Sequence, residues 1–393
     1  MTTIPVFKPK LPSARDLAPY LSEIDQNHWY TNFGPLVRRF ESKLAALTGV
    51  KPETVVTSAN ATLALTQVLL AMTQADPGGE AYCITPSWSF IATPIAIRTA
   101  GLQPYFVDVD APSWAMTPAI AEAAFHKLEK TGRTVAAIMP VCPFGSMPDL
   151  PAWENLSRRI GIPVVIDAAA SFDAVTRLPR RTDGVIGSVP VVVSLHATKA
   201  FGIGEGAFIL ARDLEMADLF RIWGNFGFCG SRQSLVPGLN AKMPEMAAAV
   251  GLALLDQWTE VRDEWATLSR MFRSHANRMS PALSTPLLSD DWISSYGIIQ
   301  LSDPAPDIRK LQAELTARGI DTRFWWEAGC HTHPSFSYVP CDPLETTMRL
   351  ASSSIGLPFW RGLSESDVCR IFDGLGEILP ALAPHALTGI GNQ

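Results

Sequence analysis

One lysine and one aspartate stand where α/β proteins place chemically active side chains. Lys199 follows the apolar run at 191–193 and precedes a glycine-rich turn at 202–206. Asp167 follows the apolar run at 164–166 and precedes three alanines. Such runs are typical of strands that are buried on both faces of a parallel sheet, and the carboxyl ends of those strands carry the reactive groups. We therefore expect Lys199 and Asp167 to lie at the same edge of a sheet.

This pair of residue types suits pyridoxal phosphate. The amine of Lys199 can form a Schiff base with the cofactor aldehyde. The carboxylate of Asp167 can keep the pyridine nitrogen protonated, which makes the ring an electron sink. On spacing alone a plainer alternative is commoner, because a lysine at a strand end is usually a solvated rim residue and an aspartate there usually caps the next helix.

Two further segments favour the cofactor interpretation. Asn60, Ala61 and Thr62 follow a short strand and open an apolar helix, where free N–H groups and the helix dipole can hold a phosphate. The alternative is an ordinary helix N-cap. Trp88 follows another predicted strand and could stack on a cofactor ring. The alternative is a core residue, since the chain has 11 tryptophans.

Composition excludes several other classes of protein. The 393 residues are 47% apolar and 18% charged, with a net charge of −6 and no segment that concentrates Lys and Arg, so we expect no nucleic-acid or membrane partner. The densest apolar stretch, 246–255, is shorter than the about 20 residues that span a bilayer. The six cysteines have no CxxC spacing, so no metal site is predicted. With no signal-like N-terminus, we expect a cytoplasmic enzyme.

Strands and helices alternate in the first part of the chain, which predicts a mixed, mostly parallel sheet flanked by helices. The expected strands are 55–57, 81–85, 104–109, 135–140, 163–167, 189–195 and 206–210, and the expected helices are 62–72, 90–99, 118–130 and 150–159. A long helix at 244–279, strands at 292–300 and 322–326 and helices at 308–318 and 365–379 then predict a smaller α+β unit. We place an N-terminal arm and large domain at 1–250 and a small domain at 251–393.

Taken in order, these motifs resemble the DegT/DnrJ/EryC/StrS family of sugar aminotransferases, which are pyridoxal-phosphate enzymes of fold type I. The most specific match is Ser194-Leu195-His196-Ala197-Thr198-Lys199, which with the Gly-Glu-Gly at 204–206 is very close to the family's SFHATK and GEGG segments. Weaker matches, which gain weight from their order, are 32–36 with Phe40 and Glu41, 60–65, 86–90, 106–110, 167–169, 238–245, 319–323 and 357–358.

The resemblance implies a role for each matching position. Lys199 would be the Schiff-base lysine and the proton carrier, Asp167 the partner of the pyridine nitrogen, and Trp88 the cover of the ring. Asn240 would reach the phosphate in a neighbouring subunit, which implies a homodimer with shared active sites. The full set of implied cofactor positions is Asn60, Ala61, Thr62, Trp88, Asp167, Ala170, Ser194, His196, Lys199 and Asn240.

Two positions depart from the family pattern. Ala61 stands where glycine is usual, which backbone donors can tolerate if the dihedral angles are ordinary. Ala170 stands where many members have Gln or His near the cofactor hydroxyl, so one hydrogen-bond partner is missing. Relatives that dehydrate sugars have His in place of the lysine. The presence of Lys199 therefore indicates the transaminating branch.

The expected reaction is amino transfer to a nucleotide-linked keto sugar, with glutamate as the donor, in cell-surface polysaccharide or secondary-metabolite biosynthesis. Because Ala170 departs from the family pattern, two alternatives on the same fold stay open: a different ketone as substrate, or a different carbanion reaction. A regulator that binds the cofactor without turnover is the alternative from another class.

Four residues are weaker site candidates. His196 could contact the cofactor, but the alternative is a core histidine. His331 and Arg323 lie where the family's small domain closes over its substrate, although a packing role is an equal alternative. Arg232, in a loop rich in Gly and Ser, could meet a diphosphate.

Overall fold

The computed structural model describes residues 2–73, 80–179, 182–184 and 186–382. Its main sheet has a four-stranded part in the order β1-β7-β6-β5 and a three-stranded part in the order β3-β2-β4. Parallel bridges between Ile138 and Val164 and between Val141 and Asp167 connect the two parts into one surface. The strands are β1 (Val55–Ser58), β2 (Tyr82–Pro86), β3 (Gln103–Val107), β4 (Val135–Ile138), β5 (Ile166–Asp167), β6 (Val191–Ser194) and β7 (Ala207–Leu210).

The central strands are buried on both faces, as their continuous apolar runs predict. Along β6, Val191 and Val193 belong to one apolar cluster and Val192 to another, because successive side chains of a strand point to opposite faces. Among the described strands of the main sheet, only β7 runs antiparallel to its neighbours, and the pairing of β2 with β3 and β4 and of β5 with β6 is parallel. This is the predicted mixed, mostly parallel sheet.

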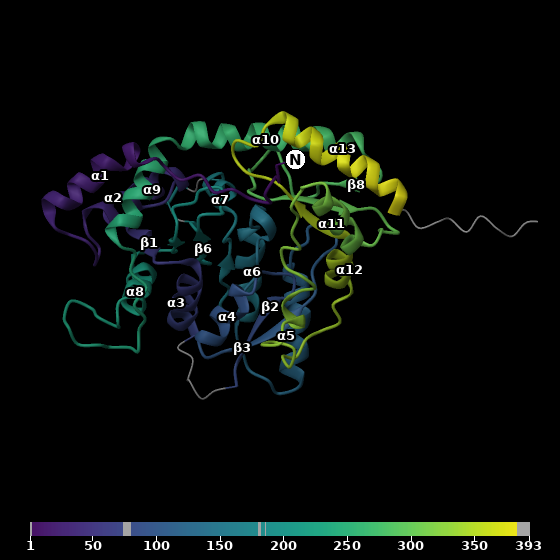
Figure 1. The fold of residues 1–393 in the computed structure, drawn as a ribbon. Helices are drawn as coiled ribbons and strands as arrows, with labels where there is room; N and C mark the ends of the chain where they lie inside the picture. The colour runs from purple at the N-terminus through teal and green to yellow at the C-terminus, as the bar shows by residue number, and fades with distance from the viewer. Residues whose placement is uncertain (1, 74–79, 180–181, 185, 383–393) are drawn as a thin grey trace, which may run out of the picture.

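Helices cover both faces of this sheet (Figure 1). On one side the cluster that contains Val192 also contains apolar side chains of α3, α4 and α8. The helices of this part are α1 (Ala14–Asn27), α2 (Pro35–Thr48), α3 (Ala61–Thr73), α4 (Ala92–Thr99), α5 (Pro118–Lys130), α6 (Leu150–Ile160), α7 (Phe172–Thr176), α8 (Leu214–Gly224) and α9 (Glu245–Asp256), with short 3-10 turns η1 (Pro52–Thr54) and η2 (Pro143–Gly145).

A second, smaller sheet follows in the order β10-β9-β8, with antiparallel pairing. Figure 1 shows the long helix α10 running from α9 along one edge of the molecule toward α13. The elements of this part are α10 (Trp258–Arg278), β8 (Leu283–Ser284), β9 (Gly297–Leu301), α11 (Ile308–Ala317), η3 (Cys330–Thr332), α12 (Glu345–Ser353), β10 (Ser354–Leu357) and α13 (Glu365–Leu382).

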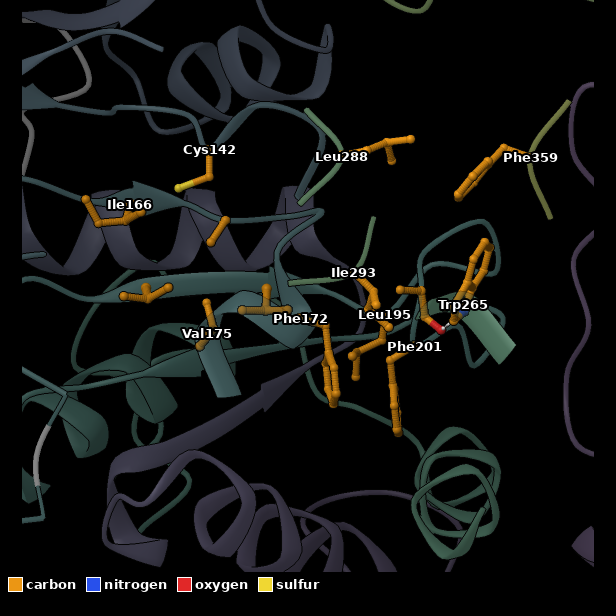
Figure 2. Packing of buried hydrophobic residues seen from close by; sticks show 14 of the residues in the cluster. Cys142, Ile166, Phe172, Val175, Leu195, Phe201, Trp265, Leu288, Ile293 and Phe359 are labelled. Atoms are coloured by element: carbon orange, nitrogen blue, oxygen red, sulfur yellow. Dashed lines mark hydrogen bonds between the residues drawn. The ribbon is translucent and has the colours of Figure 1, made fainter. Parts of the chain in front are cut away.

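The two parts of the chain share one continuous apolar core. Phe172 and Phe201 stack with ring centroids 4.2 Å apart and planes at 12°. Figure 2 shows Ile293 and Phe359, which come from the C-terminal part, in the same cluster. The domain division at residue 250 stays a prediction, and the end of the predicted small domain, 383–393, lies outside the described residues.

Several predicted elements differ from the structure. The expected helix at 244–279 is two helices, because Gln257 has φ −110° and ψ 7° and redirects the chain between α9 and α10. The expected strand at 322–326 is wrong: only Arg323 pairs, with Gly356, and the following tryptophans turn into an aromatic cluster. The expected strand at 292–300 begins only at Gly297, because the preceding residues bond to the large domain instead.

Candidate active site

Lys199 and Asp167 lie at the carboxyl ends of adjacent parallel strands. Asp167 ends β5 and is in register with Val192 of β6, which leads through a short loop to Lys199. Backbone bonds from Leu195 N to Gly206 O and from Ala197 N to Gly204 O, both 2.8 Å, tie this loop to the glycine-rich turn. The predicted juxtaposition of strand ends is therefore present in the fold.

The turn needs its glycine at 202 because the chain passes very close to itself. A Cβ on Gly202 would lie 2.6 Å from the carbonyl oxygen of Ala197. Gly204 has φ +99°, in the region that side chains other than glycine rarely adopt. The turn thus holds the backbone of the lysine segment in one arrangement.

The carboxylate of Asp167 is buried, with 4% of its surface exposed. It accepts hydrogen bonds from Thr93 Oγ1 at 2.8 Å and from the backbone N–H of Ala169 at 3.1 Å. Burial raises the pKa of Asp167, whereas these two bonds and the positive charge of Lys199 lower it. The carboxylate therefore sits in a site where its charge interacts with that of Lys199.

The amine of Lys199 has a partner that the sequence patterns do not reveal. Its Nζ donates a hydrogen bond to the Tyr296 hydroxyl at 2.8 Å and lies 5.3 Å from the centre of the Tyr296 ring. Tyr296 immediately precedes β9 and falls inside the strand predicted at 292–300, so its pattern suggested only a structural role. The signal in the sequence that could have pointed to it is a tyrosine, with its polar hydroxyl, inside a predicted strand.

The N-terminus of α3 faces the same edge of the sheet. Ser58, which ends β1, and Ser194, which ends β6, are both in register with Ala207 of β7. Strand spacing places such positions roughly 10 Å apart. Side chains and amides that follow these two strand ends can therefore converge on one ligand.

Both interpretations of the 60–62 segment are compatible with its geometry. Asn60 Oδ1 accepts from the N–H of Leu63 at 2.9 Å, so Asn60 is an N-cap. The N–H groups of Ala61 and Thr62 lie in the first turn of α3, where backbone N–H groups have no acceptor within the helix. They stay available to an anion. Ser194 Oγ accepts from the N–H of His196 at 3.2 Å, and its own proton remains free to donate to another acceptor.

Trp88 and Ala170 lie in one aromatic cluster. Trp88 is buried and makes edge contacts with Trp326 and Trp114, with centroid separations of 5.3 and 6.2 Å. Phe144 stacks on Trp326 at 3.9 Å. The position of Ala170 therefore has apolar surroundings, in which a Gln or His would have to find a polar partner. The stacking role of Trp88 stays a prediction.

The histidine candidates occupy different surroundings. The side chain of His196 is 45% exposed, so the core alternative for it is wrong. Its Nδ1 lies 2.9 Å from Thr198 Oγ1. His331 is half-buried, with Nδ1 2.7 Å from the hydroxyl of Ser87, the residue before Trp88. Burial lowers the pKa of His331, while Asp108 raises it.

Among the described residues, the remaining candidates, Arg323, Arg232 and Asn240, have no hydrogen bond or ion pair with Lys199. The guanidinium of Arg323 lies over the rings of Phe7 and Trp325, 5.3 Å from each. Arg232 is exposed on the segment between α8 and α9. Asn240, on the same segment, is exposed and accepts from Lys242 Nζ at 2.6 Å.

Within the described ranges, no three His, Cys, Asp or Glu side chains gather in a way that could hold a metal ion. No helix in the same part of the chain has both the length and the apolar composition needed to cross a bilayer.

Comparison with known proteins identifies the family. Residues 13–376 match the DegT/DnrJ/EryC1/StrS aminotransferase family. The chain belongs to this family. The predicted family, fold class, aminotransferase class and pyridoxal-phosphate cofactor are thereby confirmed.

Relatives of this DegT-family aminotransferase have nucleotide-linked sugars in their names or in the titles of their structures. A dTDP-4-amino-4,6-dideoxy-D-glucose transaminase of Shigella dysenteriae is 34% identical over 64% of this chain and 65% of its own length. GDP-perosamine synthase of Caulobacter vibrioides is 27% identical over 92% of this chain and 94% of its own. DesI, solved in the presence of its TDP-sugar product, superposes with a TM-score of 0.83 at 30% identity, covering 97% of this chain and 95% of DesI.

The residues present fit pyridoxal phosphate. The indole N–H of Trp88 is buried and has no hydrogen-bond partner among the described residues. The buried carboxylate of Asp167 offers a partner for a protonated ring nitrogen. The free N–H groups of Ala61 and Thr62 offer donors for a phosphate. The amine of Lys199 offers a partner for the aldehyde. This set of donors and acceptors matches the polar groups of the cofactor.

Proposed function

We propose that this aminotransferase transfers an amino group from glutamate to a nucleotide-linked keto sugar, in the synthesis of cell-surface polysaccharide or a secondary metabolite. The observation that carries the transfer chemistry is the placement of Lys199 and Asp167 at adjacent strand ends, within range of each other's charge. The sugar is supported by the Shigella and Caulobacter relatives and by DesI, which each have a sugar nucleotide in their name or structure.

The protein's own residues would divide the work as follows. When bound, pyridoxal phosphate supplies an electron sink that stabilises negative charge next to the reacting carbon. Lys199 would hold the cofactor aldehyde and, once released from it, would carry a proton at Nζ as general base and acid. The negative charge of Asp167 would keep the proton on the ring nitrogen. Ser194 and the first N–H groups of α3 would hold the phosphate.

The substrate would contact residues outside this centre. The half-buried His331 is bonded to Ser87, the residue before Trp88, which supports a place for it near the cofactor site. Arg323 pairs with Gly356 and opens the segment whose tryptophans enter the same aromatic cluster. Arg232 is an exposed cation that could pair with a diphosphate. We propose these three residues as the sugar-nucleotide contacts.

We also propose a homodimer with shared active sites. The segment between α8 and α9 projects from the body of the molecule (Figure 1) and exposes Phe226 (43%) and Leu235 (63%). Trp29 and Tyr30 of the N-terminal arm are also exposed, at 47% and 54%. Large apolar side chains gathered on projecting segments are typical of surfaces that a partner covers.

We also propose that the protein works in the cytoplasm. All six cysteines are unpaired, which supports a reducing compartment.

A second candidate function keeps the cofactor and changes the ketone. The apolar surroundings of Ala170 support it, because the polar partner typical of the family is absent there. Consumption of glutamate with a panel of nucleotide-linked keto sugars and simple keto acids separates the two candidates.

The absorbance band of the bound cofactor tests the proposal directly. In the wild type we expect the band to shift on addition of glutamate and to recover on addition of a nucleotide-linked 4-keto sugar. Lys199→Ala should fold normally and lose turnover, while the matched control Lys310→Ala, an exposed lysine on α11, should keep it. Turnover that persists in Lys199→Ala, or protein that neither contains nor takes up the cofactor, would refute the proposal.

A further inference from the structure

The hydrogen bond between Lys199 Nζ and the Tyr296 hydroxyl, 2.8 Å long, connects residues 97 positions apart in the sequence. We propose that Tyr296 is a positioning residue, which holds the amine of Lys199 while that amine is not bonded to the cofactor. The inference rests on the proposed function of Lys199 as the proton carrier. The inference adds Tyr296 as the residue that fixes the position of the Lys199 nitrogen while this nitrogen carries the proton.

The backbone segment just before Tyr296 is anchored to the large domain. The N–H of Ile293 donates to Asp173 Oδ2 at 3.0 Å. Ser294 Oγ donates to the carbonyl of Phe144 at 2.6 Å and accepts from the N–H of Tyr296 at 3.0 Å. The segment before β9 is therefore bound to the large-domain elements α7 and η2 rather than to the small sheet.

Asp173 is itself fixed, which makes this anchor firm. Its carboxylate is 1% exposed and accepts from Arg262 Nε of α10 at 2.8 Å as well as from the N–H of Ile293. A buried carboxylate with charged and backbone donors keeps one geometry, because each lost bond would leave a buried charge less well paired.

The ring of Tyr296 is also held by its neighbours. It makes edge contacts with Trp325 at 4.9 Å and 88° and with Phe144 at 5.4 Å and 70°. Only 8% of Tyr296 is exposed. With the backbone bonded and the ring wedged between two aromatic side chains, the hydroxyl has little freedom to move away from the lysine.

A hydroxyl suits an amine that must change its protonation state. It can accept a hydrogen bond from a charged ammonium, the direction that the Lys199 contact allows, and it can rotate its own proton to donate to a neutral amine. A carboxylate in the same place would favour only the charged form. Tyr296 can therefore hold the Lys199 nitrogen at one point before and after the proton moves.

Tyr296→Phe is the direct test, because it keeps the ring and removes only the hydroxyl. In cofactor-free protein, Lys199 is acetylated with limiting acetic anhydride and measured by peptide mass mapping, with the exposed Lys310 as internal standard. Whether the hydroxyl accepts from or donates to the amine, it shields the nitrogen. We expect its removal to raise the relative acetylation of Lys199 roughly fivefold.

In the cofactor-loaded enzyme we expect kcat to fall roughly tenfold, with KM for glutamate and cofactor retention changed less than about twofold. Tyr105→Phe is the matched control: it removes another buried tyrosine hydroxyl, one on the edge strand β3 that donates to Asp342. It should leave both readouts unchanged.

The two readouts distinguish this inference from the proposed function. Unchanged acetylation of Lys199 in Tyr296→Phe overturns the positioning role even if activity falls. A fall in kcat accompanied by an equal rise in KM overturns it as well. If the wild type transfers no amino group, the proposed function fails, and the acetylation result by itself still decides whether Tyr296 holds the amine.

Discussion

The hydroxyl of Thr93 donates a hydrogen bond to Oδ2 of Asp167 across 2.8 Å, and both residues are buried. Ser89 Oγ lies 2.7 Å from Thr93 Oγ1 and orients it. Because burial raises the pKa of Asp167, each donor that stabilises the ionised carboxylate matters to its charge state. Thr93, on α4, thus helps to set the pKa of Asp167, on β5.

Thr93→Val should move the pH dependence of activity. The substitution keeps the shape of the side chain and removes a donor that lowers the pKa of Asp167, so that pKa should rise. Since Asp167 acts as an ionised group in the proposed mechanism, the acid limb of the kcat profile should shift to higher pH. Thr48→Val, which removes a buried hydroxyl bonded to Leu44 within α2, is the control. An acid limb that stays in place in Thr93→Val would contradict the prediction.

Arg262→Ala should destabilise the protein strongly. It removes the charged partner of Asp173, which is 1% exposed, and leaves a buried carboxylate with one backbone donor. We expect the free energy of unfolding to fall by about 3 kcal/mol, measured by denaturant titration. Lys10→Ala, which removes a 3.8 Å pair with Glu264 between exposed side chains, should change it by less than about 1 kcal/mol. Equal effects of the two variants would refute this distinction.

Gly34→Ala should destabilise the start of α2. The Glu245 carboxylate is fully buried there and accepts from the N–H groups of Leu36 and Val37 at 2.8 and 2.9 Å. A Cβ on Gly34 would lie 2.6 Å from Glu245 Cδ, so the carboxylate would have to move away from these donors. We expect a loss of about 1–3 kcal/mol in the free energy of unfolding.

The opposite result is expected at a second glycine, which serves as the control. Gly376 lies in α13, and a Cβ there would meet nothing within 4 Å. Gly376→Ala should therefore stabilise the protein by about 0.5–1 kcal/mol, because alanine loses less backbone entropy in a helix. Thermal unfolding of the two variants side by side checks the pair, and a stabilised Gly34→Ala would show that Glu245 adapts freely.

Mixing two inactive variants tests the shared active site. If Asn240 of one subunit serves the Lys199 site of the other, Lys199→Ala and Asn240→Ala each lack activity alone. After dissociation and random reassociation, half of the dimers combine both variants, and each of these has one intact site. We expect roughly a quarter of wild-type activity to return. A mixture that stays inactive although mixed dimers form contradicts the shared site.

Local patterns carried most of the fold. The apolar runs before Asp167 and Lys199 predicted buried parallel strands, and β5 and β6 are adjacent and in parallel register. The glycine turn at 202–206 predicted a tight backbone path, and Gly202 has no room for a Cβ. These features follow from neighbours along the chain, because side-chain periodicity and backbone sterics act over a few residues.

Tertiary packing decided the rest. The segment 292–300 has the apolar content of a strand. Its first residues nevertheless do not pair with a strand, because Ile293 and Ser294 form hydrogen bonds with Asp173 and Phe144. The contact of Tyr296 with Lys199 arises from that choice. Likewise, the capping of α2 by Glu245 joins residues 209 positions apart. Sequence by itself therefore determined that Asp167 and Lys199 follow buried strands of the main sheet, while the partners of Lys199, Asp167 and Glu245 depended on long-range packing, which no local period encodes.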